Sequence, residues 1–147
     1  MVQMPKNWKQ IIIAVSIVSF AGNGIALLRR NLANEIVAAG DFHQVAHKAR
    51  GRAEIIKRRS GEYSLKLWNF ETTAKPDLFV YLISAPDAFE NEAVKTSDVL
   101  ELGSLKNTKG DQEYLLPQKY DPAKYRAVTI WNRRHQVNFT TAPLKEH

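Results

Sequence analysis

Residues 78–83 read LFVYLI, a run of six apolar side chains without a charge. A run of this length, followed by the turn residues Ala85-Pro86-Asp87, is typical of a central β-strand that is covered on both faces. Residues 63–67 read YSLKL, which alternates apolar and polar side chains as a half-buried strand does. The two patterns together predict a β-sheet with at least one central strand.

Short apolar runs of the same kind recur beyond Gly40, and turn residues such as Lys109-Gly110-Asp111 separate them. We predict strands near residues 41–47, 52–58, 62–70, 77–84, 98–103, 112–117, 125–132 and 135–141. The segment Pro86–Thr96 is either a short helix or a polar loop over one end of the sheet. About eight regularly spaced strands with few helix signals predict an all-β fold, an antiparallel β-sandwich or barrel-like domain.

The N-terminal part of the chain has a different character. Residues 11–28 read IIIAVSIVSFAGNGIALL, and 18 residues of helix span about 27 Å, close to the thickness of a hydrocarbon core. One interpretation is a signal peptide cleaved after Ser19-Phe20-Ala21, which would give a secreted protein. We prefer a retained signal anchor or transmembrane helix, because the apolar residues continue to Leu28 and end at Arg29-Arg30.

The resulting organisation has four parts. Residues 1–30 are the anchor, 31–39 a connector that could extend the helix, 40–144 the β domain, and 145–147 a tail. We expect the domain to lie on the extracytoplasmic side, periplasmic or at the cell surface, attached to the membrane.

Composition excludes several classes of function. The chain has no cysteine, so disulfides, thiolate metal sites and cysteine nucleophiles are excluded. The net charge of +6 suggests nucleic acid, but residues 1–30 carry four of the 21 basic side chains and no acidic one. The rest of the chain therefore has 17 basic against 15 acidic side chains, so no nucleic-acid partner is expected.

Histidines are the most versatile candidates for chemistry. His43 and His47 are four residues apart, which would place them on one face of a helix but about 13 Å apart on a strand. His135 could join either of them only through tertiary packing. Because no carboxylate–histidine spacing supports a metal site, we predict none, and these residues remain weak candidates for binding a cofactor.

No other motif predicts catalysis. No nucleophile elbow, phosphate-binding glycine loop or calcium loop is present, so an enzyme is not expected. The runs Lys48–Arg52 and Lys57–Arg59 bracket a predicted hairpin and are interpreted as a solvated edge, or as a basic strip that contacts anionic headgroups. Asn138-Phe139-Thr140 matches the glycosylation pattern, but it falls within a predicted strand.

Residues 128–132 read VTIWN, and strand alternation places Asn132 on the same face as Val128 and Ile130. That face is expected to be the core. A polar side chain that continues an apolar face near the end of a strand needs hydrogen-bond partners, or it lies at the rim.

Several segments together resemble the electron-transfer DM-thirteen (DM13) domain family, which is known from Skeletor-type proteins and is similar in setting to DOMON domains. They are Gly40-Asp41-Phe42 with His47 and Gly51, KPDLFVYL (75–82), LELGSLKNTKGDQEYLLP (100–117) and YRAVTIWNRRHQVNFTTAPL (125–144). The resemblance covers residues 38–144 and implies an extracellular or membrane-associated β domain with a redox role.

The chain departs from the family at the residue that carries this redox role. The resemblance implies a cysteine directly after the isoleucine–tryptophan pair, where this chain has Asn132, and a glycine at Lys75. Asparagine neither forms disulfides nor supplies a thiolate. We therefore expect a binding or interaction module without a cofactor, whose partners are the membrane and a redox or cell-surface protein. The alternative is an electron-transfer accessory domain with a bound haem or metal in place of the cysteine.

Overall fold

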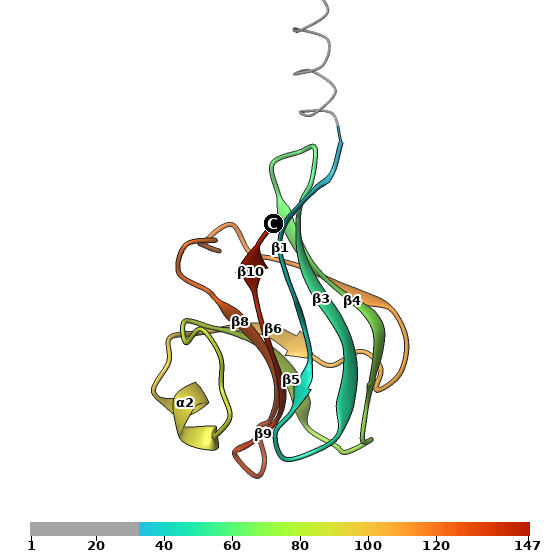
Figure 1. The fold of residues 1–147 in the computed structure, drawn as a ribbon, viewed down its shortest axis with the longest axis vertical. Helices are drawn as coiled ribbons and strands as arrows, with labels where there is room; N and C mark the ends of the chain where they lie inside the picture. The colour runs from blue at the N-terminus through green and yellow to red at the C-terminus, as the bar shows by residue number, and fades with distance from the viewer. Residues whose placement is uncertain (1–32) are drawn as a thin grey trace, which may run out of the picture. The chain divides into compact units, whose positions relative to one another are not determined.

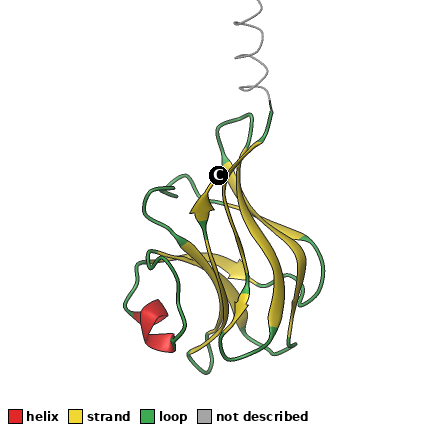
Figure 2. Cartoon of the chain, viewed as in Figure 1, coloured by secondary structure: helices red, strands yellow, loops and turns green. Residues whose placement is uncertain are grey.

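In the computed structural model, which describes residues 33–147, two antiparallel sheets of five strands face each other (Figures 1 and 2). The first sheet has the order β10-β1-β3-β4-β7 and the second the order β2-β9-β8-β5-β6. The strands are β1 (Glu35–Asp41), β2 (His43–Gln44), β3 (Ala49–Lys57), β4 (Tyr63–Thr72), β5 (Leu78–Ile83), β6 (Val99–Ser104), β7 (Gln112–Leu115), β8 (Ala127–Asn132), β9 (Val137–Pro143) and β10 (Lys145–Glu146). This architecture confirms the predicted all-β sandwich.

The inter-sheet core is formed by the side chains that alternate inward from both sheets. In the first sheet these include Ile55, Leu65 and Leu67, and β5 and β8 supply the inward residues of the second. The buried members are Phe42, Ala53, Ile55, Leu65, Leu67, Phe70, Leu78, Val80, Leu82, Leu100, Tyr114, Leu116, Tyr120, Val128, Ile130, Phe139 and Ala142. The expectation that Val128 and Ile130 face the core is confirmed.

A second, smaller core lies on the opposite face of the β5–β8 pair. Segment 84–98, which contains the short helix α2 (Asn91–Lys95), places Ala88 and Val94 against Ile83 and Trp131. Figure 1 shows this segment beside the second sheet. Because β5 contributes Val80 and Leu82 to the first core and Ile83 to the second, the prediction of a strand covered on both faces is confirmed.

The two sheets are joined at one corner by two strands that bend from one sheet into the other. In the first sheet Ala38 pairs with Glu146 and Ala39 with Lys145; in the second, His43 pairs with Thr141. The register is continuous through the bend, since each step forward on one strand is matched by a step back on the other. One side of the sandwich is thereby closed, which gives it a barrel-like character.

Gly40 lies at this corner, where the two backbones approach closely. A Cβ atom built on Gly40 would lie 1.7 Å from the carbonyl oxygen of Pro143, far inside the contact distance of any two atoms. Only glycine therefore fits at this position of the bend.

Three sequence predictions differ from the structure. One strand over 41–47 is wrong, because the chain changes sheet at Phe42 and residues 45–48 lie outside any strand. β1 begins at Glu35, inside the segment predicted as a connector, and Lys145–Glu146 of the predicted tail forms β10. These pieces are short or rich in Ala and Gly, so their strand conformation depends on pairing with β3 and with each other, not on local propensity.

The predicted anchor at 11–28 lies outside the described residues. Within residues 33–147, no helix has the length and apolar character that a membrane crossing requires.

Candidate functional site

Asn132 is the last residue of β8 and pairs across the sheet with Leu78. Its side chain is buried, with 3% of its surface exposed. Its Oδ1 accepts the backbone N–H of His135 at 2.9 Å, and its Nδ2 donates to the carbonyl oxygen of Pro76 at 3.4 Å. The prediction that a polar residue at this point needs hydrogen-bond partners is confirmed.

These bonds make Asn132 the cap of the β8–β9 turn. Gln136 closes the turn with a positive φ of 57°, and its side-chain amide donates to the carbonyl oxygen of Arg133 at 2.7 Å. Arg133 fixes the turn to the neighbouring strands, since its guanidinium lies 3.7 Å from the ring centre of Phe79 and forms an ion pair with Glu101. Both ends of the Asn132 amide are therefore engaged in holding the hairpin.

His43 connects β2 to segment 84–98. Its Nε2 lies 2.6 Å from Oδ1 of Asp87, and its ring stacks on Phe89 with the ring centres 4.5 Å apart. The same carboxylate oxygen of Asp87 accepts the backbone N–H of Ala88 at 2.8 Å. These contacts give His43 a structural role in attaching the segment to the sheet.

The other two histidines occupy different settings. The ring of His47 packs on Phe139 with centres 3.9 Å apart, and His135 is part of the turn that Asn132 caps. Within residues 33–147, no group of three or more His, Asp or Glu side chains is arranged to hold a metal ion. His43, His47 and His135 thus have different neighbours and form no such group.

A buried polar network beneath segment 84–98 was not expected from the sequence. Asn138 has no exposed surface, and its side chain bonds to the hydroxyl of Thr141 at 3.0 Å and to the carbonyl oxygen of Ala88 at 3.4 Å. Thr141 bonds in turn to Thr129 at 2.9 Å. The glycosylation pattern at Asn138 is therefore inaccessible in the folded domain, and it lies in a strand as predicted.

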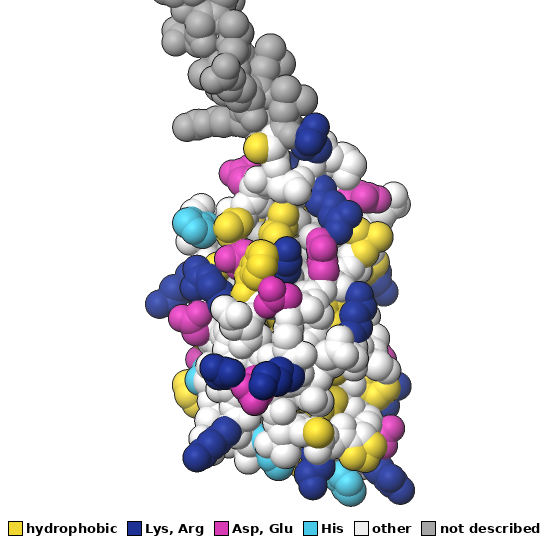
Figure 3. Space-filling view, turned by 90° about the vertical axis from the view of Figure 1, so that its right-hand side faces the viewer, with side chains coloured by type: hydrophobic (Ala, Val, Ile, Leu, Met, Phe, Trp, Pro, Cys, Tyr) yellow, Lys and Arg dark blue, Asp and Glu magenta, His cyan; other side chains and the backbone are white. Residues whose placement is uncertain are grey.

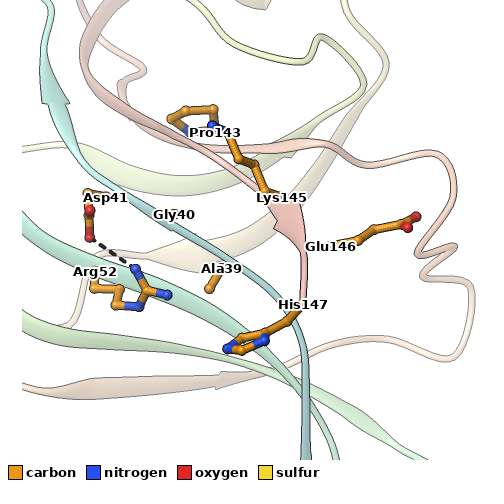
Figure 4. A pocket seen from close by; sticks show the side chains of 8 residues that line it. All are labelled: Ala39, Gly40, Asp41, Arg52, Pro143, Lys145, Glu146 and His147. Atoms are coloured by element: carbon orange, nitrogen blue, oxygen red, sulfur yellow. Dashed lines mark hydrogen bonds and ion pairs between the residues drawn. The ribbon is translucent and has the colours of Figure 1, made fainter.

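An open hollow of about 480 Å³ lies at the corner where the two sheets join (Figure 4). Ala39 and Gly40 supply small side chains, while Arg52 and His147 border the space. It is lined by Ala39, Gly40, Asp41, Arg52, Pro143, Lys145, Glu146 and His147. Arg52 lies 3.4 Å from Asp41, and both side chains are exposed, so the hollow presents charges of both signs and suits a polar partner.

A family model described as Electron transfer DM13 matches residues 41–144. The chain belongs to this family. No curated protein and no solved structure matches it. The match to the DM13 model runs from the last residue of β1 to the residue before β10, so it includes the corner, the second core and the Asn132 turn.

The DM13 domain also contains a cluster of three tyrosines near the β3–β4 hairpin. The ring centres of Tyr63 and Tyr120 are 5.1 Å apart, and those of Tyr120 and Tyr125 are 6.1 Å apart. Burial raises the pKa of Tyr120 to about 12, with smaller contributions from Tyr63 and the charge of Asp121. The raised pKa keeps Tyr120 uncharged at physiological pH.

The raised pKa of Tyr120 predicts an alkaline loss of stability. The phenol ionises near 10.0 in the unfolded chain but keeps its proton to about 12 in the fold. Between these values the unfolded state binds fewer protons, so stability falls as the pH rises, by about 3 kcal/mol in all. Urea unfolding of Tyr120→Phe across the alkaline range should lack this component, whereas Tyr125→Phe should retain it; equal slopes in the two variants would contradict the assignment.

Proposed function

We propose that this DM13 domain is a non-catalytic binding module, held on the extracytoplasmic side of a membrane by the apolar segment 11–28. The observation that carries the proposal is the burial of Asn132 and its hydrogen bonds. The resemblance implied a redox cysteine at this position, whereas here an amide occupies it, is buried and is engaged by Pro76 and His135. A side chain whose oxygen bonds within the turn and whose nitrogen bonds to the segment before β5 supports a structural role, not a reactive one.

The surface that best supports binding is the corner hollow. It carries charges of both signs, among them the exposed Asp41–Arg52 pair. We infer that a redox or cell-surface protein with polar side chains is the partner there, because apolar small molecules favour enclosed, hydrophobic cavities.

The alternative is an electron-transfer domain with a haem or metal ion in place of the thiol, and the description of the family model favours it. Of the four histidines in residues 33–147, His43, His47 and His135 lie within the β domain as predicted and are the candidate ligands. They lie in three separate settings and do not fit a shared site, so we assign no redox step to them.

Absorbance and metal analysis of the full chain, purified without a histidine tag, separates these two functions. We expect no visible absorption band and no stoichiometric metal, because the candidate ligands are not gathered. A haem or flavin spectrum, or one metal ion per chain, would establish the electron-transfer alternative and refute the binding module.

A cysteine variant tests the Asn132 position itself. In Asn132→Cys the new thiol should be buried as Asn132 is, and should react slowly with a thiol reagent without a reversible redox couple. Asn132→Ser, which introduces no sulfur, is the matched control for loss of the turn cap. A reversible couple in the cysteine variant alone would mean that the surroundings still favour redox chemistry.

Anchoring is tested on isolated membranes. The full chain should resist alkaline extraction, and its N-terminal sequence should still contain the apolar segment. A mature N-terminus at Gly22 would refute the anchor and support secretion.

A further inference from the structure

A row of four residues, three of them aliphatic, crosses the outer face of the first sheet. Ile36 pairs with Ile56, Ile56 with Ser64, and Ser64 with Leu115, so that one residue from each of four strands lies in line. Ser64 is the polar member of the row and is buried. At about 4.8 Å per strand, the row extends roughly 14 Å. Leu115 is 59% exposed and Ile36 38% exposed. Two of the four large hydrophobic side chains that are exposed within residues 33–147 therefore belong to this outer row.

The β3–β4 hairpin lies beside the outer row and carries charges of both signs. Residues 57–62 read KRRSGE, and Arg58 is paired with Glu113 at 2.6 Å, so that Lys57 and Arg59 remain beside the acidic Glu62. The hairpin is closed by the N–H of Gly61, which donates to the carbonyl oxygen of Arg58 at 2.9 Å. In the view of Figure 3, Lys and Arg side chains lie among hydrophobic and acidic ones in the upper half of the domain.

The chain length places this end of the domain close to the end of the apolar segment. Glu35, the first residue of β1, pairs with Lys57 beside the hairpin. Only six residues lie between Leu28 and Glu35, and the seven steps along the chain limit the distance between them to about 24 Å even when fully extended. The hairpin and the outer row are thus the parts of the sheet that lie beside Glu35, the strand residue nearest in sequence to the proposed anchor.

We propose that the outer row and the hairpin dock onto an anionic bilayer surface, with Leu115 and Ile36 entering the interface and Lys57 and Arg59 contacting lipid headgroups. The inference rests on the proposed anchoring and adds a defined orientation to it. Exposed aliphatic side chains and basic residues together match the chemistry of an anionic bilayer surface. The corner hollow at the β1–β10 side is then left for a protein partner.

The cysteine-free chain allows a direct test with a single introduced thiol. Leu115→Cys and Phe89→Cys each receive an environment-sensitive fluorophore, and the full chain is reconstituted into vesicles of equal amounts of phosphatidylcholine and phosphatidylglycerol. Phe89 is the matched control, because it is also exposed, at 69%, but lies in segment 84–98 beside the second sheet. Spin-labelled lipid should quench the Leu115 label at least about twofold more than the Phe89 label.

Charge and anchoring are tested with the same samples. Adding Lys57→Gln and Arg59→Gln to the Leu115→Cys variant should reduce quenching in the anionic vesicles but not in phosphatidylcholine alone. A chain that floats with the vesicles but shows equal quenching at the two positions refutes the docking and leaves the anchor intact. A chain that does not float with the vesicles refutes the anchor and the docking together.

Discussion

Replacement of Gly40 by alanine is expected to destabilise the domain by at least about 3 kcal/mol, because the new methyl group has no space. Its Cβ would lie 1.7 Å from the carbonyl oxygen of Pro143 and 2.8 Å from the carbonyl carbon. Both atoms belong to the backbone, so a rotamer change cannot relieve the overlap. The two strands must therefore separate at the corner, and the β-sheet pairs on both sides of the bend are lost.

Urea unfolding of the full chain in detergent, followed by circular dichroism, measures this effect. Gly110→Ala is the matched control: Gly110 has a φ of +113°, but nothing lies within 4 Å of the added Cβ atom. Gly110→Ala should lose only about 1 to 2 kcal/mol of stability, because alanine is strained at this positive φ. A Gly40→Ala variant no less stable than Gly110→Ala would contradict the close approach of the two strands.

Replacement of Trp131 by alanine is expected to cost about 3 to 5 kcal/mol and to release segment 84–98. Trp131 is 3% exposed and packs with Ile83, Ala88 and Val94 in the second core. The other buried members of that cluster are small or aliphatic, and the ring of Tyr81 stacks on Trp131 with centres 6.3 Å apart, so removal of the indole leaves a cavity among side chains that cannot fill it.

Hydrogen exchange gives the local readout for Trp131→Ala. Protection should fall first in the helix Asn91–Lys95 and remain in β3 and β4, which contribute to the other core. Trp131→Phe should restore most of the protection, and Phe89→Ala, at a side chain that is 69% exposed, should have little effect on stability. Uniform loss of protection over both sheets would mean that the second core is not a separate unit.

The sequence predicted the parts of the fold whose signal is local. The apolar run at 78–83 and the alternation at 63–67 each reflect the face that a strand presents to the core, and both strands are present as expected. β1 was not predicted, because Ala38, Ala39 and Gly40 have small side chains without strand preference. Its conformation comes from pairing with β3 and β10, which is visible only in three dimensions.

The candidate site, too, was predicted only where its sequence signal is local. Alternation along β8 predicted that Asn132 would require hydrogen-bond partners, but one partner, Pro76, is 56 residues away in the sequence. The corner hollow was not predicted at all, since its residues come from both ends of the β domain and meet only because two strands bend between the sheets. Long-range pairing of this kind leaves no periodic pattern in the sequence.

The pairing of β1 also determines how the domain responds to mechanical load. Tension applied at Glu35 acts along the strand, whereas the hydrogen bonds to β3 and β10 lie perpendicular to it. The load is therefore a shear that is shared by the whole ladder, in contrast to a peeling force that would break one pair at a time. β1 is thus suited to withstand pulling from its N-terminal end while the remainder of the sandwich stays folded.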